Sequence, residues 1–246
     1  MKVAILAPTS WLHHYSALSQ YHLTLLHLYR IPEYYDFYIQ RVEQGDWVIL
    51  DNGANEGIAA GDDELFSAAI RYNVSEVVAP DQPRDGEEST ERTLKFLSER
   101  RDQLHMAGIR VCAIPQGKSI RHWVYNFHLM RPYADSIGIS KIVEEFTPRI
   151  VLAQLANDWG VPIHLMGADT KFSDIINYHD LRNVRGVDTQ KMVAAAAHNV
   201  LIGPNTNKRG FDSIDLGSPP LADLDEDRHG FALTNIQRYR KWAGDD

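Results

Sequence analysis

The stretch WVILDNGANEG, residues 47–57, contains the pattern that decides the fold. Its first four residues form a short apolar run, and Asp51 and Asn52 follow directly before Gly53. Such a run is typical of a strand buried on both faces of a parallel sheet. The polar residues after it then lie at the carboxyl end of the strand, where α/β proteins hold their ligands.

Similar apolar runs recur along the chain, at residues 2–7, 76–79, 110–114, 136–139, 162–166, 184–187 and 200–202. Helical spacing separates them, at residues 62–72, 89–106, 147–159 and 190–198. In the third of these, Thr147 is expected to cap a helix whose first residue is Pro148, because proline is favoured at that position. Seven or eight such alternations predict a single (β/α)8 TIM-like barrel, with a doubly wound open sheet as the alternative.

The domain organisation predicted from the 246 residues is one barrel domain, residues 1–246, because no linker divides the chain. Residues 13–44 are rich in aromatic side chains and are interpreted as a helix plus an insertion after the first strand. Residues 203–246 form a loop-rich end, in which residues 203–228 carry Gly, Pro, Asn and Asp and a last helix lies near residues 231–242.

Composition excludes several classes of protein. The net charge of −8 argues against nonspecific coating of nucleic acid, so any such contact must be local. Cys112 is the only cysteine, which excludes a disulfide framework and a cysteine-rich zinc site and fits a cytoplasmic location. We expect no membrane span, because no apolar run reaches about 18 residues. The N-terminus does not have the pattern of a signal peptide.

Polar residues follow the predicted strands in a consistent way. The strands deliver four aspartates and one glutamine to the same rim: Asp51, Asp81, Asp169, Asp188 and Gln116. Each aspartate alone could cap a helix or form a turn. In a closed barrel, however, they converge on one mouth, which is the signature of a ligand pocket. Carboxylates there can act as nucleophile or as acid and base, and an Asp–Gln pair can read a purine-like edge.

The order of these segments resembles the tRNA-guanine transglycosylase family, whose barrel exchanges guanine for a 7-deazaguanine. The family segments D-S-G-G-F-Q, F-D-E, V-Q-G-G, G-L-A, L-M-G and F-D-C-V-M-P are matched in order by residues 51–55, 79–82, 115–118, 138–140, 165–167 and 187–192. The resemblance implies that Asp188 is the nucleophile attacking the sugar C1′ and that Asp51 is the general acid and base. It also implies a base-binding group formed by Asp81, Gln116, Asn52, Gly138, Met166 and Gly167.

Departures from the family pattern bear on the substrate. The tRNA-acting members carry a zinc site of three cysteines and one histidine, which a chain with one cysteine cannot build. The sequence therefore looks more like the DNA-acting branch of bacteria and phages, with DNA rather than tRNA as the expected polymer and a free 7-deazaguanine as co-substrate. No metal or other cofactor is expected. A homodimer or an accessory protein remains a possible partner, and basic residues could follow a phosphate backbone: Lys191, Lys208, Arg209, Arg238, Arg240 and Lys241.

Two other classes of function stay open at this point. One is a non-catalytic partner subunit of a transglycosylase, because the segment around Asp188 matches the nucleophile motif only loosely. The other is an unrelated barrel lyase, hydrolase or nucleoside glycosidase that uses the same rim carboxylates. Activity on a polymer rather than on a free nucleoside would distinguish a transglycosylase from this last class.

Overall fold

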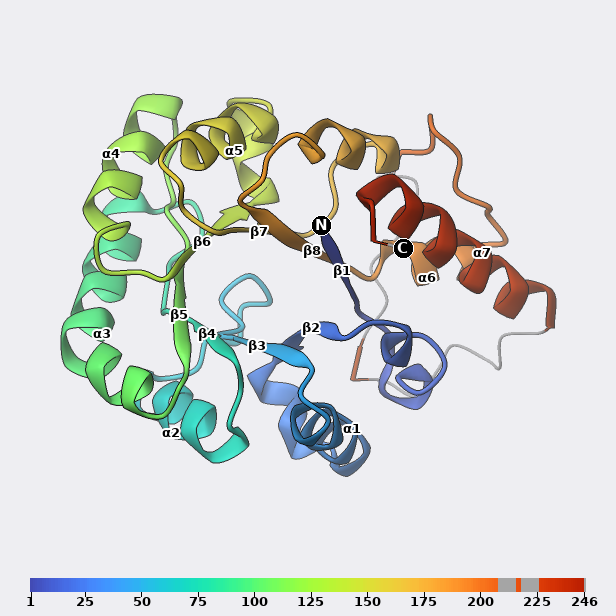
Figure 1. Ribbon diagram of the computed structural model, residues 1–246, viewed down its shortest axis with the longest axis horizontal. Coiled ribbons are helices and arrows are strands. Elements are labelled where there is room, and N and C mark those ends of the chain that lie inside the picture. Colours follow the sequence, from blue (N-terminus) through green and yellow to red (C-terminus); the bar gives the residue numbers. More distant parts are fainter. Residues whose placement is uncertain (208–215, 218–225, 246) are drawn as a thin grey trace.

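Eight parallel strands form the centre of the computed structural model, which describes residues 1–207, 216–217 and 226–245. The strands are β1 Lys2–Ile5, β2 Tyr21–Leu25, β3 Trp47–Asp51, β4 Glu76–Val78, β5 Arg110–Ala113, β6 Ser136–Ser140, β7 Ile163–Met166 and β8 Val184–Thr189. From β2 to β8 each strand pairs with the next in the chain, and β8 pairs with β1. This order is that of a nearly closed (β/α)8 barrel, which confirms the predicted fold (Figure 1).

The barrel has one seam, between β1 and β2. These strands contact each other, but among the described residues no backbone ladder joins them. In the segment between the two strands, the Ser16 hydroxyl donates a hydrogen bond of 2.7 Å to the carbonyl of Ile5 at the end of β1. The two strands therefore close the ring by contact, without a described backbone ladder.

Helices surround the ring of strands on the outside (Figure 1). The α-helices are α1 Pro32–Glu43, α2 Asp62–Tyr72, α3 Gly86–Met106, α4 Ile120–Met130, α5 Arg149–Asp158, α6 Lys191–Ala197 and α7 Glu226–Ala243. Short 3₁₀ helices are η1 Thr9–Trp11, η2 Ser16–Leu18, η3 Leu26–Arg30, η4 Lys141–Glu145 and η5 Phe172–Tyr178. Helix α7 packs on α6 and β1, and Asp245 just after it accepts a hydrogen bond of 3.1 Å from the Val3 backbone nitrogen. The last helix thus fixes the first strand.

The strand β2 was not expected from the sequence, which predicted a helix plus an insertion over residues 13–44. Helix α1 is present there, but β2 belongs to the barrel and is no insertion. The strand was not predicted because His22 and Thr24 interrupt its apolar pattern. Both side chains are buried, and each has a hydrogen-bond partner on or beside β3. His22 bonds Asp46 at 3.0 Å, and Thr24 donates to the Ile49 carbonyl at 3.0 Å.

Two smaller predictions were wrong. Residues 200–202 form no strand, since the Ile202 backbone nitrogen donates to Asn235 of α7 at 2.8 Å and β1 is already paired with β8. Thr147 does not cap α5. The helix begins at Arg149, because Pro148 has an extended backbone (φ −57°, ψ 130°) and stands at the N-cap position itself. Of the predicted loop 203–228, residues 208–215 and 218–225 lie outside the described part of the chain, and residues 226–228 already belong to α7.

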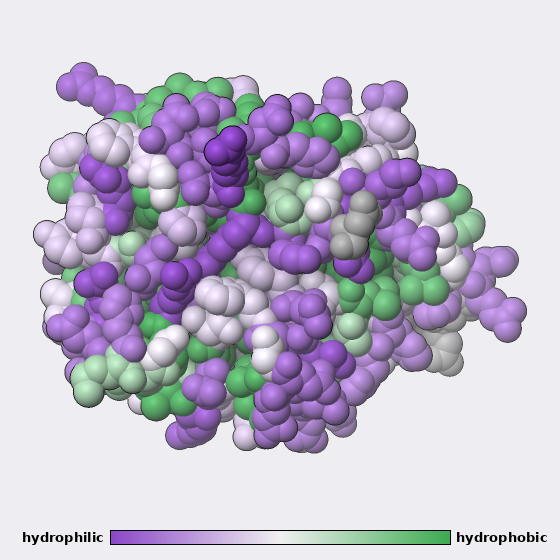
Figure 2. All heavy atoms as spheres, viewed as in Figure 1, coloured by the Kyte–Doolittle hydropathy of each residue, from purple (hydrophilic) through white to green (hydrophobic). Residues whose placement is uncertain are grey.

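The face of the molecule in Figure 2 is mainly polar. Figure 2 shows hydrophilic residues over most of the face in view, with apolar patches between them. In the parts of the chain that the structure describes, none of the helices is long and apolar enough to cross a membrane.

Candidate functional site

A cavity of about 470 Å³ lies at the carboxyl ends of the strands. Seven of the residues predicted for the site line it: Asp51, Asn52, Asp81, Gln116, Met166, Gly167 and Asp188. Other polar lining residues are His27, Asn55, Glu56, Ser140, Lys141, Thr189, Gln190 and Lys191, and apolar ones include Leu23, Leu25, Ile58 and Ile114. The convergence of the strand ends therefore brings most of the predicted group into one concave site.

The first cluster in the cavity is centred on Asp81. Its two carboxylate oxygens accept hydrogen bonds from Asn52 Nδ2 at 2.9 Å and from Gln116 Nε2 at 2.8 Å. All three side chains are buried. Burial raises the pKa of Asp81, and the two amide hydrogen bonds oppose that rise. Each amide nitrogen has a second N–H; that of Asn52 bonds the Ala79 carbonyl at 2.9 Å.

Asp51 lies at the end of β3 and keeps its proton more readily than an ordinary carboxylic acid. Burial raises its pKa well above the usual value, and the charge of Glu56 raises it further. The Gly53 N–H donates to Asp51 Oδ1 at 2.7 Å and acts in the opposite direction, because it stabilises the carboxylate. Gly53 has a φ of 75°, and a Cβ there would lie 2.7 Å from the Ile58 carbonyl oxygen. A glycine is therefore required for this turn.

Asp188, near the end of β8, behaves in the opposite way. Burial raises its pKa, but hydrogen bonds from His164 and the Gly167 N–H, with the charge of Lys141, outweigh burial, so the pKa is lowered overall. His164 Nε2 lies 3.0 Å and the Gly167 nitrogen 2.9 Å from Asp188 Oδ1. The cavity thus holds one carboxyl group that favours its acid form and one that favours its anion, which is how acid and nucleophile roles are separated.

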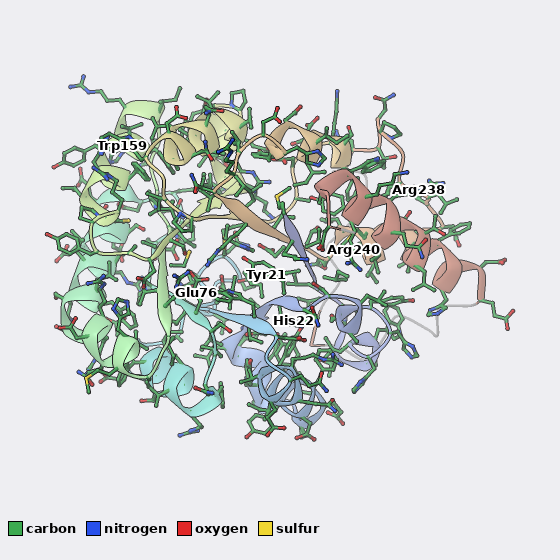
Figure 3. All side chains as sticks on the ribbon, in the orientation of Figure 1. Tyr21, His22, Glu76, Trp159, Arg238 and Arg240 are labelled. Carbon is green, nitrogen blue, oxygen red and sulfur yellow. The ribbon has the colours of Figure 1, made fainter. Side chains whose placement is uncertain are left out.

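His164 and Tyr21 are site residues that the sequence pattern did not predict. The Tyr21 hydroxyl lies 2.8 Å from His164 Nδ1, so the two residues form a chain that ends on Asp188. Figure 3 shows Tyr21 inside the ring of strands. One signal could have found His164: it is two residues before Met166 in β7, and alternate residues of a strand share a face. Tyr21 could not be found, because its strand was not recognised.

Two residues predicted for the rim, Gly138 and Asp169, are not among the described residues that line the cavity. Gly138 is in β6 and is not among the described residues that line the cavity; a Cβ there would lie 2.9 Å from Ile114 and 3.4 Å from Met166, so the glycine makes room for the cavity wall. Asp169 turns away from the mouth and accepts a hydrogen bond of 2.9 Å from Arg149 Nε. Ser140, two residues after Gly138, lines the cavity instead.

Arg149 fixes the loop that follows β7. It is fully buried and donates to the carbonyls of Met166 at 3.0 Å and Gly167 at 2.7 Å, besides its pair with Asp169. Because Gly167 in turn donates to Asp188, this buried arginine holds the backbone that orients the carboxylate.

Replacing Arg149 with Met is expected to destabilise the fold by about 3–5 kcal/mol, because Asp169 would remain as a buried charge without its partner. Urea unfolding followed by circular dichroism measures the change. The control is Arg84→Met, which removes an exposed pair with Glu145 and should change stability by less than about 1 kcal/mol. An Arg149→Met protein as stable as the control would contradict this reading of the pair.

The basic residues expected to follow a phosphate backbone have different surroundings. Lys191 lines the cavity. Arg238 donates to the Ile202 carbonyl at 2.8 Å and Arg240 to the Leu18 carbonyl at 2.9 Å, so these two arginines, labelled in Figure 3, bind the chain's own backbone. Lys208 and Arg209 lie outside the described residues. Lys141, which was not among the basic residues predicted to contact nucleic acid, lines the cavity close to Gly167.

The residues present do not fit the zinc site of the tRNA-acting transglycosylases. The single cysteine, Cys112, is buried in β5, and burial raises the pKa of its thiol to about 12. Within the described residues, no group of three or more His, Cys, Asp or Glu side chains is arranged to hold a metal ion.

No protein-family model matches the sequence, and a search of curated proteins finds no match. Solved structures resemble the fold. The YdjI aldolase from Escherichia coli K12 has a TM-score of 0.60 at 15% identity, over 92% of this chain and 81% of that chain. A D-psicose 3-epimerase studied with D-fructose has a TM-score of 0.60 at 11% identity, over 99% of this chain and 100% of that chain. The D-psicose 3-epimerase from Clostridium cellulolyticum H10 has a TM-score of 0.59 at 10% identity, over 99% of each chain.

These three structures are similar to this chain in fold. At such identities the likeness shows the barrel alone, and none of the three is described as a transglycosylase. The chain is therefore a (β/α)8 barrel with a polar cavity at the carboxyl ends of its strands. Its chemistry depends on the residues of that cavity and not on the fold.

Proposed function

We propose that this protein is a transglycosylase that exchanges guanine in DNA for a 7-deazaguanine through a covalent intermediate on Asp188. The observation that carries the proposal is the contrast between two carboxyl groups of one cavity: the pKa of Asp188 is lowered and that of Asp51 is raised. An anionic carboxylate can attack, and a protonated one can donate to a leaving group. The motif order described above supplies the choice of guanine as the leaving group.

In the first step an oxygen of Asp188 forms a bond to C1′ of the nucleotide while the bond from C1′ to N9 of guanine breaks. The electron pair of that bond goes to guanine, and Asp51 supplies the proton that makes the departing base neutral. In the second step the incoming base gives its N9 proton to the Asp51 carboxylate and attacks C1′ with N9. The bond to Asp188 then breaks, and both carboxyl groups return to their starting states.

The cluster of Asp81, Gln116 and Asn52 is suited to hold the base. Asp81 can accept from N–H groups on the guanine edge, and the second Nε2 hydrogen of Gln116 can donate to the base carbonyl. Met166, which lines the same cavity, can pack on the base plane. The base must leave its stack to reach this site, which costs least in single-stranded or distorted DNA.

The Asp81→Ala variant is expected to bind guanine or a 7-deazaguanine about 10- to 100-fold more weakly, because the base N–H groups lose their acceptor at a cost of roughly 1–3 kcal/mol. Isothermal titration calorimetry with the free base measures the change. Asp85→Ala is the control, because Asp85 is an aspartate that caps α3 and does not line the cavity. Equal affinity of Asp81→Ala and the parent protein would remove this cluster from the base site.

The experiment that tests the function is incubation of the protein with guanine-containing DNA or, separately, tRNA, together with candidate 7-deazaguanine bases. Mass spectrometry of the digested nucleosides then shows whether a deazaguanine has entered either polymer. Incorporation into DNA supports the proposal, and incorporation into tRNA alone would change the substrate. Release of free guanine without incorporation would identify a hydrolase, and activity only on free nucleosides a nucleoside glycosidase.

A further inference from the structure

A hydrogen-bonded chain of three side chains crosses the inside of the barrel beneath the cavity. The Tyr21 hydroxyl lies 2.8 Å from His164 Nδ1, and His164 Nε2 lies 3.0 Å from Asp188 Oδ1. Tyr21 and His164 are 5% and 1% exposed, so water does not compete for these bonds. The chain joins three strands, β2, β7 and β8, and ends on a carboxylate that lines the cavity.

The backbone opposite Tyr21 is shaped to admit its ring. Gly186 of β8 faces that ring, and a Cβ at this position would lie 2.3 Å from Cε1 and 2.6 Å from Cζ of Tyr21. Any residue other than glycine would force the ring away. Tyr21 also comes from β2, the strand that lacks a backbone ladder to β1 among the described residues. Its hydroxyl therefore links β2 to β7.

The direction of the hydrogen bonds follows from the tyrosine. Burial raises the pKa of Tyr21 far above its ordinary value, so the phenol keeps its proton and can donate it to His164 Nδ1. A neutral histidine that accepts at Nδ1 carries its proton at Nε2. That proton points at Asp188, where the carboxylate accepts it.

We propose that Tyr21 and His164 are positioning residues for Asp188: they bind its Oδ1 and leave Oδ2 to attack C1′. The assignment rests on the proposed function. Both hydrogen bonds to Asp188 within the described residues, from His164 and from Gly167, end on Oδ1. Tyr21 acts one step further back, because it fixes the tautomer in which His164 is a donor to the carboxylate.

The test uses Tyr21→Phe, which keeps the ring and removes the hydroxyl, with Tyr29→Phe as the matched control. Tyr29 is also buried and its hydroxyl donates to Thr24 Oγ1 at 3.2 Å, but it touches neither His164 nor Asp188 in this chain of bonds. The first measurement needs no reaction. Carbon-13 NMR of labelled aspartate follows the titration of Asp188, assigned with Asp188→Asn, and nitrogen-15 NMR reports the tautomer of His164, assigned with His164→Gln.

In the parent protein we expect a His164 ring protonated at Nε2. In Tyr21→Phe we expect a mixture of tautomers and a higher midpoint for the titration of Asp188, whereas Tyr29→Phe should match the parent in both. The second measurement is the pH dependence of kcat for base exchange. Tyr21→Phe should lower kcat about tenfold, as for the loss of one hydrogen bond, move the acidic limb upward and leave KM unchanged.

The two possible failures are distinguishable. If the parent shows no base exchange, the proposed function is wrong, while the NMR titration still reports whether the chain controls Asp188. If Tyr21→Phe and Tyr29→Phe both titrate like the parent and keep its tautomer, Tyr21 only fills space and the positioning role is overturned. The titration of Asp188 in Tyr21→Phe and Tyr29→Phe decides between these outcomes even if a His164 variant fails to fold.

Discussion

An Asp188→Asn variant is expected to lose base exchange and the covalent adduct together, with exchange lowered by at least about 10⁴-fold. Asparagine keeps the size of the side chain and an oxygen that can accept from His164 and Gly167, so the hydrogen bonds that fix Asp188 Oδ1 in the parent can persist. It has no anionic oxygen, however, and cannot form the ester to C1′. The loss is thus expected in the chemical step, with the fold retained.

A denaturing gel of the protein with labelled DNA measures the adduct. Omitting the incoming base should increase the adduct of the parent, because nothing then displaces the sugar from Asp188. Unfolding in urea, compared with the parent, checks that the variant is folded. If Asp188→Asn exchanges bases at the parent rate, the nucleophile must be sought elsewhere in the cavity, with Asp51 the first candidate. A folded parent that binds DNA but forms no adduct would favour the non-catalytic subunit.

An Asp51→Asn variant is expected to exchange bases about 10²- to 10⁴-fold more slowly, because the leaving base would have to depart without a proton. Since Asp188 remains, the covalent adduct should still form, but slowly. The pH dependence carries a second expectation. The pKa of Asp51 is raised, so its acid form persists to higher pH than in an ordinary aspartate, and the first step should fail as pH rises through that raised value.

Towards low pH the limit is set by Asp188, whose lowered pKa keeps it ionised below the usual range. The parent should therefore be active between these two titrations, and Asp51→Asn should lose the alkaline limb while keeping the acidic one. Single-turnover rates of base exchange across the pH range measure both limbs. The control is Asp63→Asn, an exposed aspartate paired with Arg100. An alkaline limb that persists in Asp51→Asn would assign the proton to another group.

Most strands of the barrel could be predicted from the sequence, and the failures of the prediction have physical causes. A continuous apolar run such as Val48–Leu50 identifies a strand because both of its faces are buried. The strand β2 was missed since His22 and Thr24 break that pattern, and their burial is tolerable only because β3 and the residue before it supply partners. Residues 200–202 have the composition of a strand, but the Ile202 backbone nitrogen donates to Asn235 of α7 instead of to a neighbouring strand.

The site shows the same division. Asp51, Asp81, Gln116 and Asp188 follow apolar runs directly, so the sequence alone places them at the carboxyl ends of strands, and a barrel brings those ends together. The sequence does not separate an aspartate at the mouth from one beneath it. Asp169 follows β7 in the same manner, yet it pairs with Arg149 and is buried away from the cavity.

The sequence by itself determined the fold class, the polar rim and the identity of most side chains around the cavity, because strand period and strand-end chemistry are local properties. Only the tertiary structure decided the protonation of that rim. The pKa of Asp51 rises because the folded chain buries it beside Glu56, and that of Asp188 falls because His164 and Gly167, distant in sequence, donate to it. Burial and partners are set by contacts between strands, and no local pattern of residues encodes them.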